Sequence, residues 1–198
     1  MKRHECMAAV ADQLADALVV ATNGLTGTDW LAVAPPALHD RLWRMRTMGL
    51  CSSVALGLAL TRPQVQVVAF DGDGSILMNA SSLTTIGRHR PPNLVHVVFD
   101  NGCYEASGGL ITHTGAAQAA GRQVDLAGMA SAAGVPSVAR ARTLAEFQEA
   151  FGAALRGQVC TFIHALVEAG PAEGARVRPP DEVENKYRFL RAVRELAG

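Results

Sequence analysis

Short, mostly apolar runs recur along the chain, separated by stretches that are rich in glycine, proline and charged residues. The runs cover residues 18–21, 65–70, 94–99, 136–140 and 159–167. Apolar runs of this length, bounded by turn residues, are typical of strands buried on both faces of a parallel sheet. The pattern therefore predicts a sheet whose strands lie mostly in the interior.

The segments between these runs show helical spacing of apolar residues. The clearest begins with Thr143-Leu144-Ala145-Glu146, which has the form of a capping box, and continues with Phe147, Phe151 and Leu155 on the face of Leu144. Further helices are expected over residues 5–17, 49–60, 76–89 and 125–133. Strands that alternate with helices predict an α/β protein, a doubly wound parallel sheet with helices on both faces.

Nothing in the sequence divides the chain into separate domains. We expect one domain over residues 1–198, with a linker-like stretch at 170–174 and a helical C-terminal appendage over 175–198. The appendage carries Arg188, Arg191 and Arg194 at helical spacing, which predicts a solvated face or, alternatively, a contact with a partner.

Composition and charge exclude several classes of function. Of 198 residues, 49% are apolar and 18% charged, and 18 basic side chains balance 18 acidic ones. Without a basic stripe or zinc pattern, nucleic acid binding is not expected. No apolar stretch is long enough for a membrane span, and residues 1–5 do not open a signal peptide, so we expect a soluble cytoplasmic protein. The four cysteines form no C-x-x-C pair, which argues against disulfides and zinc.

The candidate chemistry follows two neighbouring strands. Gly72-Asp73-Gly74 comes after the run at 65–70, and Asn101 follows the run at 94–99, 28 residues beyond Asp73. Parallel strands would bring both to the edge where open α/β sheets bind ligands. Carboxylate and amide oxygens suit Mg²⁺ or Ca²⁺, and Gly72 and Gly74 would allow a sharp turn and close approach to a phosphate. These residues predict a phosphate-bearing cofactor held through a divalent ion.

This pairing resembles the signature of the thiamine diphosphate enzymes, in which Gly-Asp-Gly is followed at such a distance by a pair ending in Asn. The resemblance implies that Mg²⁺ is coordinated by Asp73, by the Asn101 amide oxygen and by the main-chain carbonyl of Cys103. It also implies a set of cofactor-binding residues around these ligands. They are Thr22, Gly24, Met48, Gly49, Gly72, Gly74, Ser75 and Tyr104.

Within that family the chain is most similar to phosphonopyruvate and sulfopyruvate decarboxylases. Residues 104–109 resemble the loop that follows the magnesium ligands in those enzymes, and residues 180–183 together with 188–191 resemble their C-terminal helix. The chain departs from them at Leu110-Ile111, where they tend to have Gln-Pro. The candidates for substrate contact or catalysis are Glu105, Ser107 and His113, which lie in this glycine-rich loop.

The resemblance implies a partner as well. In this family a Glu beside the pyrimidine ring activates the cofactor, and that Glu belongs to a separate pyrimidine-binding domain. Because only some twenty residues precede the first predicted strand, we expect that domain to be supplied by another chain. We therefore expect the diphosphate-binding subunit of a two-component 2-oxoacid decarboxylase, with sulfopyruvate or phosphonopyruvate as the kind of substrate. The alternatives are a thiamine-dependent carboligase of the acetolactate or acyloin type, and a non-catalytic regulatory subunit with a vestigial site. A nicotinamide enzyme is disfavoured because Leu77 stands where the third glycine of G-x-G-x-x-G would be.

Overall fold

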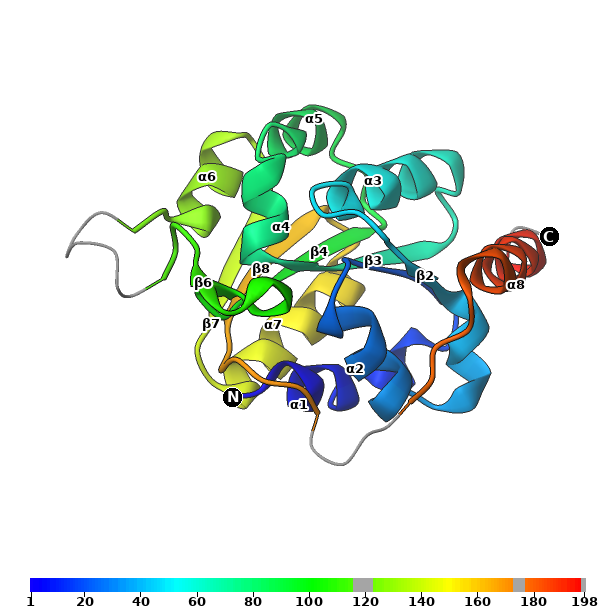
Figure 1. Ribbon diagram of the computed structural model, residues 1–198. Coiled ribbons are helices and arrows are strands. Elements are labelled where there is room, and N and C mark those ends of the chain that lie inside the picture. The colour runs from blue at the N-terminus through cyan, green and yellow to red at the C-terminus, as the bar shows by residue number, and fades with distance from the viewer. Residues whose placement is uncertain (116–122, 173–176, 197–198) are drawn as a thin grey trace.

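A parallel sheet forms the centre of the molecule. The computed structural model describes residues 1–115, 123–172 and 177–196, and within them the central sheet has the strand order β2-β1-β3-β4-β8-β7 (Figure 1). The strands are β1 Ala17–Ala21, β2 Leu42–Arg44, β3 Gln66–Gly72, β4 Leu94–Asp100, β7 Ser137–Ala141 and β8 Thr161–Leu166. Every neighbouring pair is parallel. The predicted doubly wound parallel sheet is confirmed.

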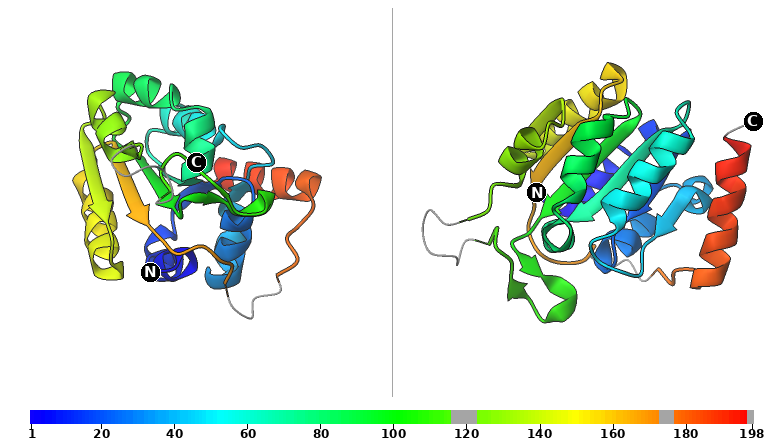
Figure 2. Two further views of the ribbon diagram at one scale, coloured as in Figure 1. Left: turned by 60° about the vertical axis from the view of Figure 1, so that its left-hand side comes forward. Right: turned by 90° about the horizontal axis from the view of Figure 1, so that it is seen from above.

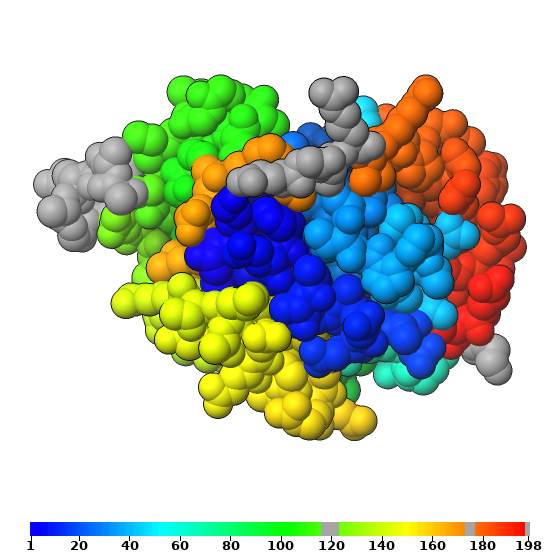
Figure 3. All heavy atoms as spheres, turned by 90° about the horizontal axis from the view of Figure 1, so that it is seen from below, coloured from blue at the N-terminus to red at the C-terminus, as the bar shows by residue number. Residues whose placement is uncertain are grey.

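Helices cover both faces of this sheet (Figures 1 and 2). One face carries α1 Arg3–Ala8, η1 Ala11–Leu14, α2 Leu25–Val33, η2 Pro36–Arg41 and α7 Leu144–Gly157. Figure 3 looks onto this face and shows α1, α2 and α7 side by side. The other face carries α3 Cys51–Thr61, α4 Asp73–Met78, α5 Ser82–His89 and α6 Leu126–Ala132.

Alternating side chains of the central strands supply two cores, one on each face. In β3, Val68 and Phe70 join the core beneath α1, α2 and α7, whereas Val67 and Ala69 join the core beneath α3 to α6. This follows from the period of two along a strand, which points neighbouring side chains to opposite faces. Because both faces are covered, the strand is apolar at nearly every position, as the sequence pattern predicted.

Two predicted helices are shorter than expected. The helix expected over 5–17 is split into α1 and η1, and the one expected over 76–89 is split into α4, which begins at Asp73, and α5. The second break lies at Asn79, whose Nδ2 donates to the Gly49 carbonyl oxygen at 2.8 Å. An Asn side chain that bonds to backbone elsewhere competes with the helix, which accounts for the break.

Several elements had no clear signal in the sequence. They are α2, β2, and a hairpin made by β5 Cys103–Tyr104 and β6 Leu110–Ile111, with the short helix η3 Glu105–Ser107 between its strands. The strands among them are only two or three residues long, so their apolar pattern is too short to distinguish from loop. Each of these strands forms because a neighbouring strand pairs with it.

The C-terminal helix α8 Glu182–Glu195 lies along the edge of the sheet at β2. Phe189 and Val193 pack against Leu18 and Val65. Asn185 is buried, and its amide accepts from Arg44 N at 3.0 Å and donates to the Leu42 carbonyl oxygen at 2.7 Å. The predicted linker at 170–174 and the predicted start of the appendage at 175 fall partly on residues 173–176, which lie outside the described residues.

None of the helices in the described part of the chain combines the length and the apolar character needed to cross a bilayer.

Candidate functional site

An open pocket lies outside the carboxyl ends of β1, β3 and β4. In the sheet, β2 lies on one side of β1 and β3 lies on the other. The strand order therefore reverses between β1 and β3. Open α/β sheets bind ligands at such points. All but one of the residues predicted to bind the cofactor line this pocket. They are Thr22, Gly24, Met48, Gly72, Asp73, Gly74, Ser75, Asn101, Cys103 and Tyr104.

The remaining predicted residue, Gly49, lies directly behind the pocket wall. Its N–H donates to the hydroxyl oxygen of Ser75 at 3.0 Å, and Thr22 Oγ1 donates to the same oxygen at 2.8 Å. Ser75 is buried. A single hydroxyl thus ties the end of β1, the start of α4 and the Met48-Gly49 turn together.

The carboxylate of Asp73 lies at the first residue of α4 and is 2% exposed. Thr112 Oγ1 donates to its Oδ2 at 2.5 Å, and Thr114 Oγ1 lies 3.1 Å from the same oxygen. Burial raises the pKa of Asp73, and the nearby charge of Asp100 acts in the same direction. A buried carboxylate with a raised pKa favours any cation that can reach it.

A threonine hydroxyl links the carboxylates of Asp73 and Asp100. Thr114 Oγ1 also lies 2.8 Å from Asp100 Oδ1 and 2.9 Å from Thr112 Oγ1. Oxygen atoms of two carboxylate groups and two hydroxyl groups thus lie within hydrogen-bond distance of one another. A divalent cation on Asp73 would offset the negative charge of the two neighbouring carboxylates, so the donor set fits a hard metal ion.

The other two predicted magnesium ligands lie in the turn after β4. Asn101 Oδ1 accepts from Cys103 N at 3.0 Å, and Asp100 Oδ1 accepts from Gly102 N at 3.0 Å. Gly102 has a φ of +71°, a left-handed conformation that favours glycine. An amide oxygen has two lone pairs, so Asn101 Oδ1 can coordinate a metal ion with one while the other accepts the hydrogen bond in the turn.

Two helices open on the pocket without a side chain to cap them. Gly24 precedes α2 and Gly72 precedes α4, and neither helix has a side-chain hydrogen bond at its N-cap. Gly24, Leu25, Thr26, Gly74 and Ser75 all line the pocket. Uncapped N–H groups at helix N-termini are suited to phosphate oxygens. The pocket therefore fits a diphosphate group beside the metal site.

Of the two glycines in the Gly-Asp-Gly triplet, only Gly74 stands where a side chain would clash. A Cβ on Gly74 would lie 2.3 Å from Cε1 of Tyr104, so only glycine allows this ring against α4. Gly72 has a φ of −121°, which any residue can adopt, and a Cβ there would meet nothing closer than 3.9 Å. The sharp turn expected at Gly72 is not present, because β3 runs directly into α4.

The structure places two of the three predicted catalytic residues in the pocket and the third outside it. Glu105 and Ser107 line the pocket, whereas His113 is exposed and does not line it. Glu105 Oε2 accepts from Arg3 Nη1 at 2.9 Å, and Oε1 accepts from Gly170 N at 2.5 Å. Arg3 is buried and also pairs with Asp29 at 2.8 Å. Glu105 is thus anchored by two segments that lie far apart in the sequence, and Asp29 in turn holds Arg3.

Arg3, Thr112 and Thr114 contact the candidate site residues although nothing in the sequence singled them out. The only sequence signal for the threonines is their place in Thr112-His113-Thr114, where a period of two puts both on one side of an extended chain. The described residues contain no group of three or more His, Cys, Asp or Glu side chains placed to hold a metal. A ligand set of one carboxylate, one amide and one carbonyl would not form such a group.

Comparison with known proteins gives consistent matches. Residues 28–165 match the family described as thiamine pyrophosphate enzyme, C-terminal TPP binding domain. The chain is 36% identical to a phosphonopyruvate decarboxylase from Streptomyces viridochromogenes, over 87% of this chain and 42% of that protein. It is 32% identical to a sulfopyruvate decarboxylase subunit beta from Methanothermobacter thermautotrophicus, over 98% of this chain and 96% of that protein.

The chain spans less than half the length of the longer relatives, since a sulfopyruvate decarboxylase from Methanosarcina acetivorans is also covered only to 49%. Among solved structures, a thiamine diphosphate-dependent 4-hydroxybenzoylformate decarboxylase from Rhodococcus jostii RHA1 superposes with a TM-score of 0.71. That match covers 87% of this chain and 33% of the other at 20% identity, so it supports the fold alone.

Proposed function

The chain belongs to the thiamine pyrophosphate enzyme family through its TPP-binding domain, and on that premise we propose that it is the diphosphate- and Mg²⁺-binding subunit of a two-component 2-oxoacid decarboxylase. The observation that carries this proposal is the pocket in which Asp73, Asn101 and two uncapped helix N-termini converge. Its substrate is a 2-oxoacid with an anionic tail, of the sulfopyruvate or phosphonopyruvate kind.

In this proposal the residues of the pocket have distinct tasks. Asp73, the Asn101 amide oxygen and the Cys103 carbonyl oxygen hold Mg²⁺, and the N-termini of α2 and α4 hold the diphosphate oxygens. When bound, thiamine diphosphate supplies a nucleophilic carbon and an electron sink for the loss of a carboxylate. Glu105 and Ser107 form the wall of the pocket beside the metal site, where they can orient a substrate. His113 can reach the pocket only if its loop moves.

Exposed apolar side chains around the pocket support a partner subunit. Leu50 is 44% exposed, Met78 58%, Leu110 66% and Ile111 49%. Leu50 lies two residues after Met48, and a Cβ on Gly49 would lie 3.3 Å from the Met78 Cβ. Leu110 and Ile111 pair with Tyr104 and Cys103 in the hairpin. Clustered exposed apolar residues mark interaction sites. We assign this surface to a pyrimidine-binding partner that supplies the activating Glu.

The first experiment is a calorimetric titration of thiamine diphosphate and Mg²⁺ into the tagged chain isolated from its own host, so that a natural partner travels with it. We expect Mg²⁺-dependent binding in the wild type and its loss in Asp73→Ala. Asp16→Ala serves as the matched control, since the Asp16 side chain is 91% exposed and precedes β1, whereas the pocket lies beyond the other end of that strand. Unchanged cofactor affinity in Asp73→Ala would contradict the ligand assignment.

The second experiment measures CO₂ release by the same complex from sulfopyruvate, phosphonopyruvate and pyruvate. We expect release to be fastest with the anionic-tailed substrates. A complex that binds the cofactor and couples pyruvate to an aldehyde, without net aldehyde release, would instead indicate a carboligase. A complex that binds no cofactor would indicate a vestigial site.

A further inference from the structure

The outer face of α8 carries a second group of exposed apolar residues, which the pocket and its partner do not explain. Val183 is 64% exposed, Tyr187 61% and Leu190 37%. With Arg194 they follow one another at intervals of four, three and four residues, so they form a single stripe along the helix. This spacing is that of the contact seam in paired helices.

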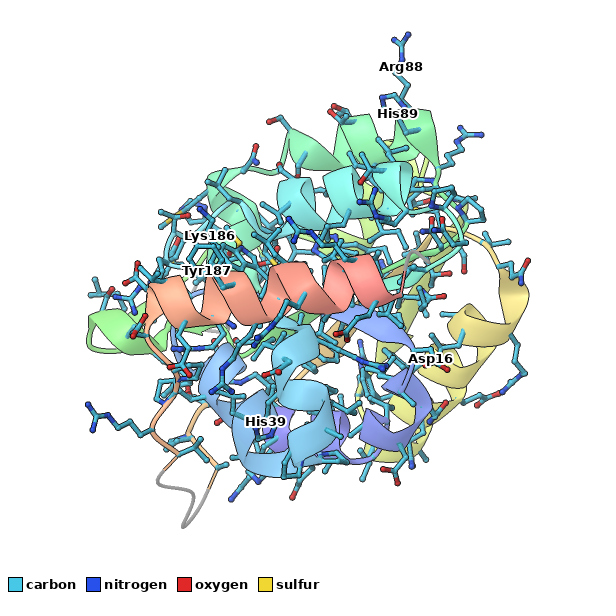
Figure 4. All side chains as sticks on the ribbon, turned by 90° about the vertical axis from the view of Figure 1, so that its right-hand side faces the viewer. Asp16, His39, Arg88, His89, Lys186 and Tyr187 are labelled. Carbon is cyan, nitrogen blue, oxygen red and sulfur yellow. The ribbon has the colours of Figure 1, made fainter. Side chains whose placement is uncertain are left out.

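The inner face of the same helix is already fully used. Asn185, Phe189 and Val193 are buried against the edge of the sheet. A helix at the surface of a globular protein usually has a polar outer face. In α8, which crosses the front of the view in Figure 4 with no other element over it, apolar residues lie on both faces instead. The outer stripe is therefore an unpartnered helix face.

Two charged side chains lie on the same side of the stripe, seven residues apart. Glu184 lies in the first turn of α8 and Arg191 lies two turns later, whereas Lys186 and Arg188 lie between them in the sequence and Glu195 ends the helix. A parallel pair would place the two copies of each of these charges at the same level along the helices. An antiparallel pair instead brings Glu184 of each helix beside Arg191 of the other, an opposite-charge contact that the two-fold axis repeats.

We infer that the outer face of α8 binds α8 of a second copy of this chain, in an antiparallel pair with two-fold symmetry. The seam places Tyr187 opposite Leu190 of the second copy, and the reverse. Glu184 then lies beside Arg191 of the second copy on both sides of the axis. Glu184 also pairs with Arg188 within its own helix, and a carboxylate has acceptor capacity for both.

The contact is small, and this determines its strength. A helix of 14 residues is about 21 Å long. Two such helices bury less than the roughly 800 Å² per partner of a standard interface. We therefore expect a dimer of the isolated chain that dissociates on dilution.

This inference does not depend on the proposed function. The hairpin that carries Leu110 and Ile111 and the helix α8 lie on different sides of the molecule in Figures 1 and 2 (right). The hairpin part of the partner surface is therefore separate from the outer stripe of α8. Loss of cofactor binding would leave the dimer intact, and loss of the dimer would leave cofactor binding intact.

A charge-swap experiment tests the orientation as well as the contact. Sedimentation velocity of the full-length chain over a concentration series should show a monomer–dimer equilibrium. Glu184→Arg alone and Arg191→Glu alone should each weaken the dimer at least tenfold, because each opposes like charges across both sides of the axis. An equimolar mixture of the two variants should restore a dimer, since both cross-axis pairs then carry opposite charges.

The matched control is Arg156→Glu, a reversal on the exposed end of α7, at the opposite edge of the sheet, which should leave the dimer unchanged. Leu190→Glu should abolish dimerisation while circular dichroism shows an unchanged fold. A wild-type chain that remains monomeric at every concentration overturns the inference. So does a dimer that both single reversals leave intact, or one that the mixture does not restore.

Discussion

At the scale of single residues, the candidate site is organised by hydroxyl groups that link carboxylates. Thr112 and Thr114 reach Asp73 from a hairpin that begins after β4, and Thr114 also contacts Asp100. Both hydroxyls contact Oδ2 of Asp73, and this fixes the carboxylate where it lines the pocket. Residues that orient a ligand in this way affect metal affinity almost as much as the ligand itself.

We expect Thr112→Val to weaken Mg²⁺-dependent binding of thiamine diphosphate by about tenfold or more, because the isosteric side chain removes the hydroxyl that fixes Asp73. Thr112→Ser retains the hydroxyl and should bind nearly as well as the wild type. Calorimetric titration at a series of Mg²⁺ concentrations measures both variants. Equal losses in the two variants would mean that the methyl group, and not the hydroxyl, matters.

A pH effect is expected from Asp100. Burial opposes its ionisation, but hydrogen bonds from His164 at 2.7 Å and from Thr114 outweigh that cost, so the pKa of Asp100 in the folded protein lies below its ordinary value of 3.8. A lowered pKa stabilises the folded protein above pH 3.8, and this stabilisation is lost as the pH falls through the folded pKa. In Asp100→Asn the loss of unfolding free energy should therefore be greatest at neutral pH.

Chemical denaturation of the wild type and of Asp100→Asn, at neutral pH and at several values below 3.8, tests this directly. The difference between the two proteins should shrink toward acid. A difference that stays constant with pH would assign the effect to packing.

Residue types and strand positions predicted that Asp73 and Asn101 would meet at one edge of the sheet, and the family resemblance supplied most of the other predicted residues that line the pocket. Neither source predicted Thr112, Thr114 or Arg3. No local spacing relates residue 112 to residue 73, or residue 3 to residue 105. These contacts exist only after the hairpin folds back and the N-terminal helix packs beneath it.

At the scale of helices and strands, the sequence predicted an element correctly where the residues that start it lie within the element or next to it. The capping box at Thr143 and Glu146 is present, and Asp125 caps α6 as expected. The prediction of a single helix over 76–89 was wrong because the break at Asn79 depends on a hydrogen bond to Gly49, which lies far away in the sequence. The strand β2 was missed because its neighbours, not its own three residues, define it.

We expect Thr143→Ala to lower the free energy of unfolding by about 1 kcal/mol, because it leaves the N–H of Glu146 without its acceptor at the start of α7. Urea denaturation measures the change. Thr84→Ala, within α5, is the control and should be close to neutral, since its hydroxyl bonds only within its own helix. Equal costs in both variants would show that the cap itself contributes nothing.

At the scale of the whole molecule, two groups of apolar side chains are exposed, one around the pocket and one on the outer face of α8. Alternation of strands and helices was enough to predict the sheet and its two helical layers. It could not order the strands or place α8 along β2, because those arrangements depend on contacts between distant segments. The exposed surface at the hairpin likewise became visible only when Leu110 and Ile111 were placed beside the pocket.

We expect Leu110→Asp to reduce recovery of the partner subunit at least tenfold when the tagged chain is isolated from its host, because a charge would be buried in an apolar contact. The free energy of unfolding of the isolated chain should not change, since Leu110 is 66% exposed. Val159→Asp, at a 39% exposed position outside the hairpin, is the control and should leave recovery unchanged. Equal losses in both variants would point to general damage.

The amide of Asn185 has a consequence beyond the packing of α8. It gives the outer edge of β2 one donor and one acceptor, at Leu42 and Arg44, in the places where another strand would otherwise pair. An open strand edge invites the strands of other chains and is a common origin of aggregates. By closing this edge with a side chain from a helix, the protein remains available for specific association and resists the uncontrolled growth of its sheet from one molecule to the next.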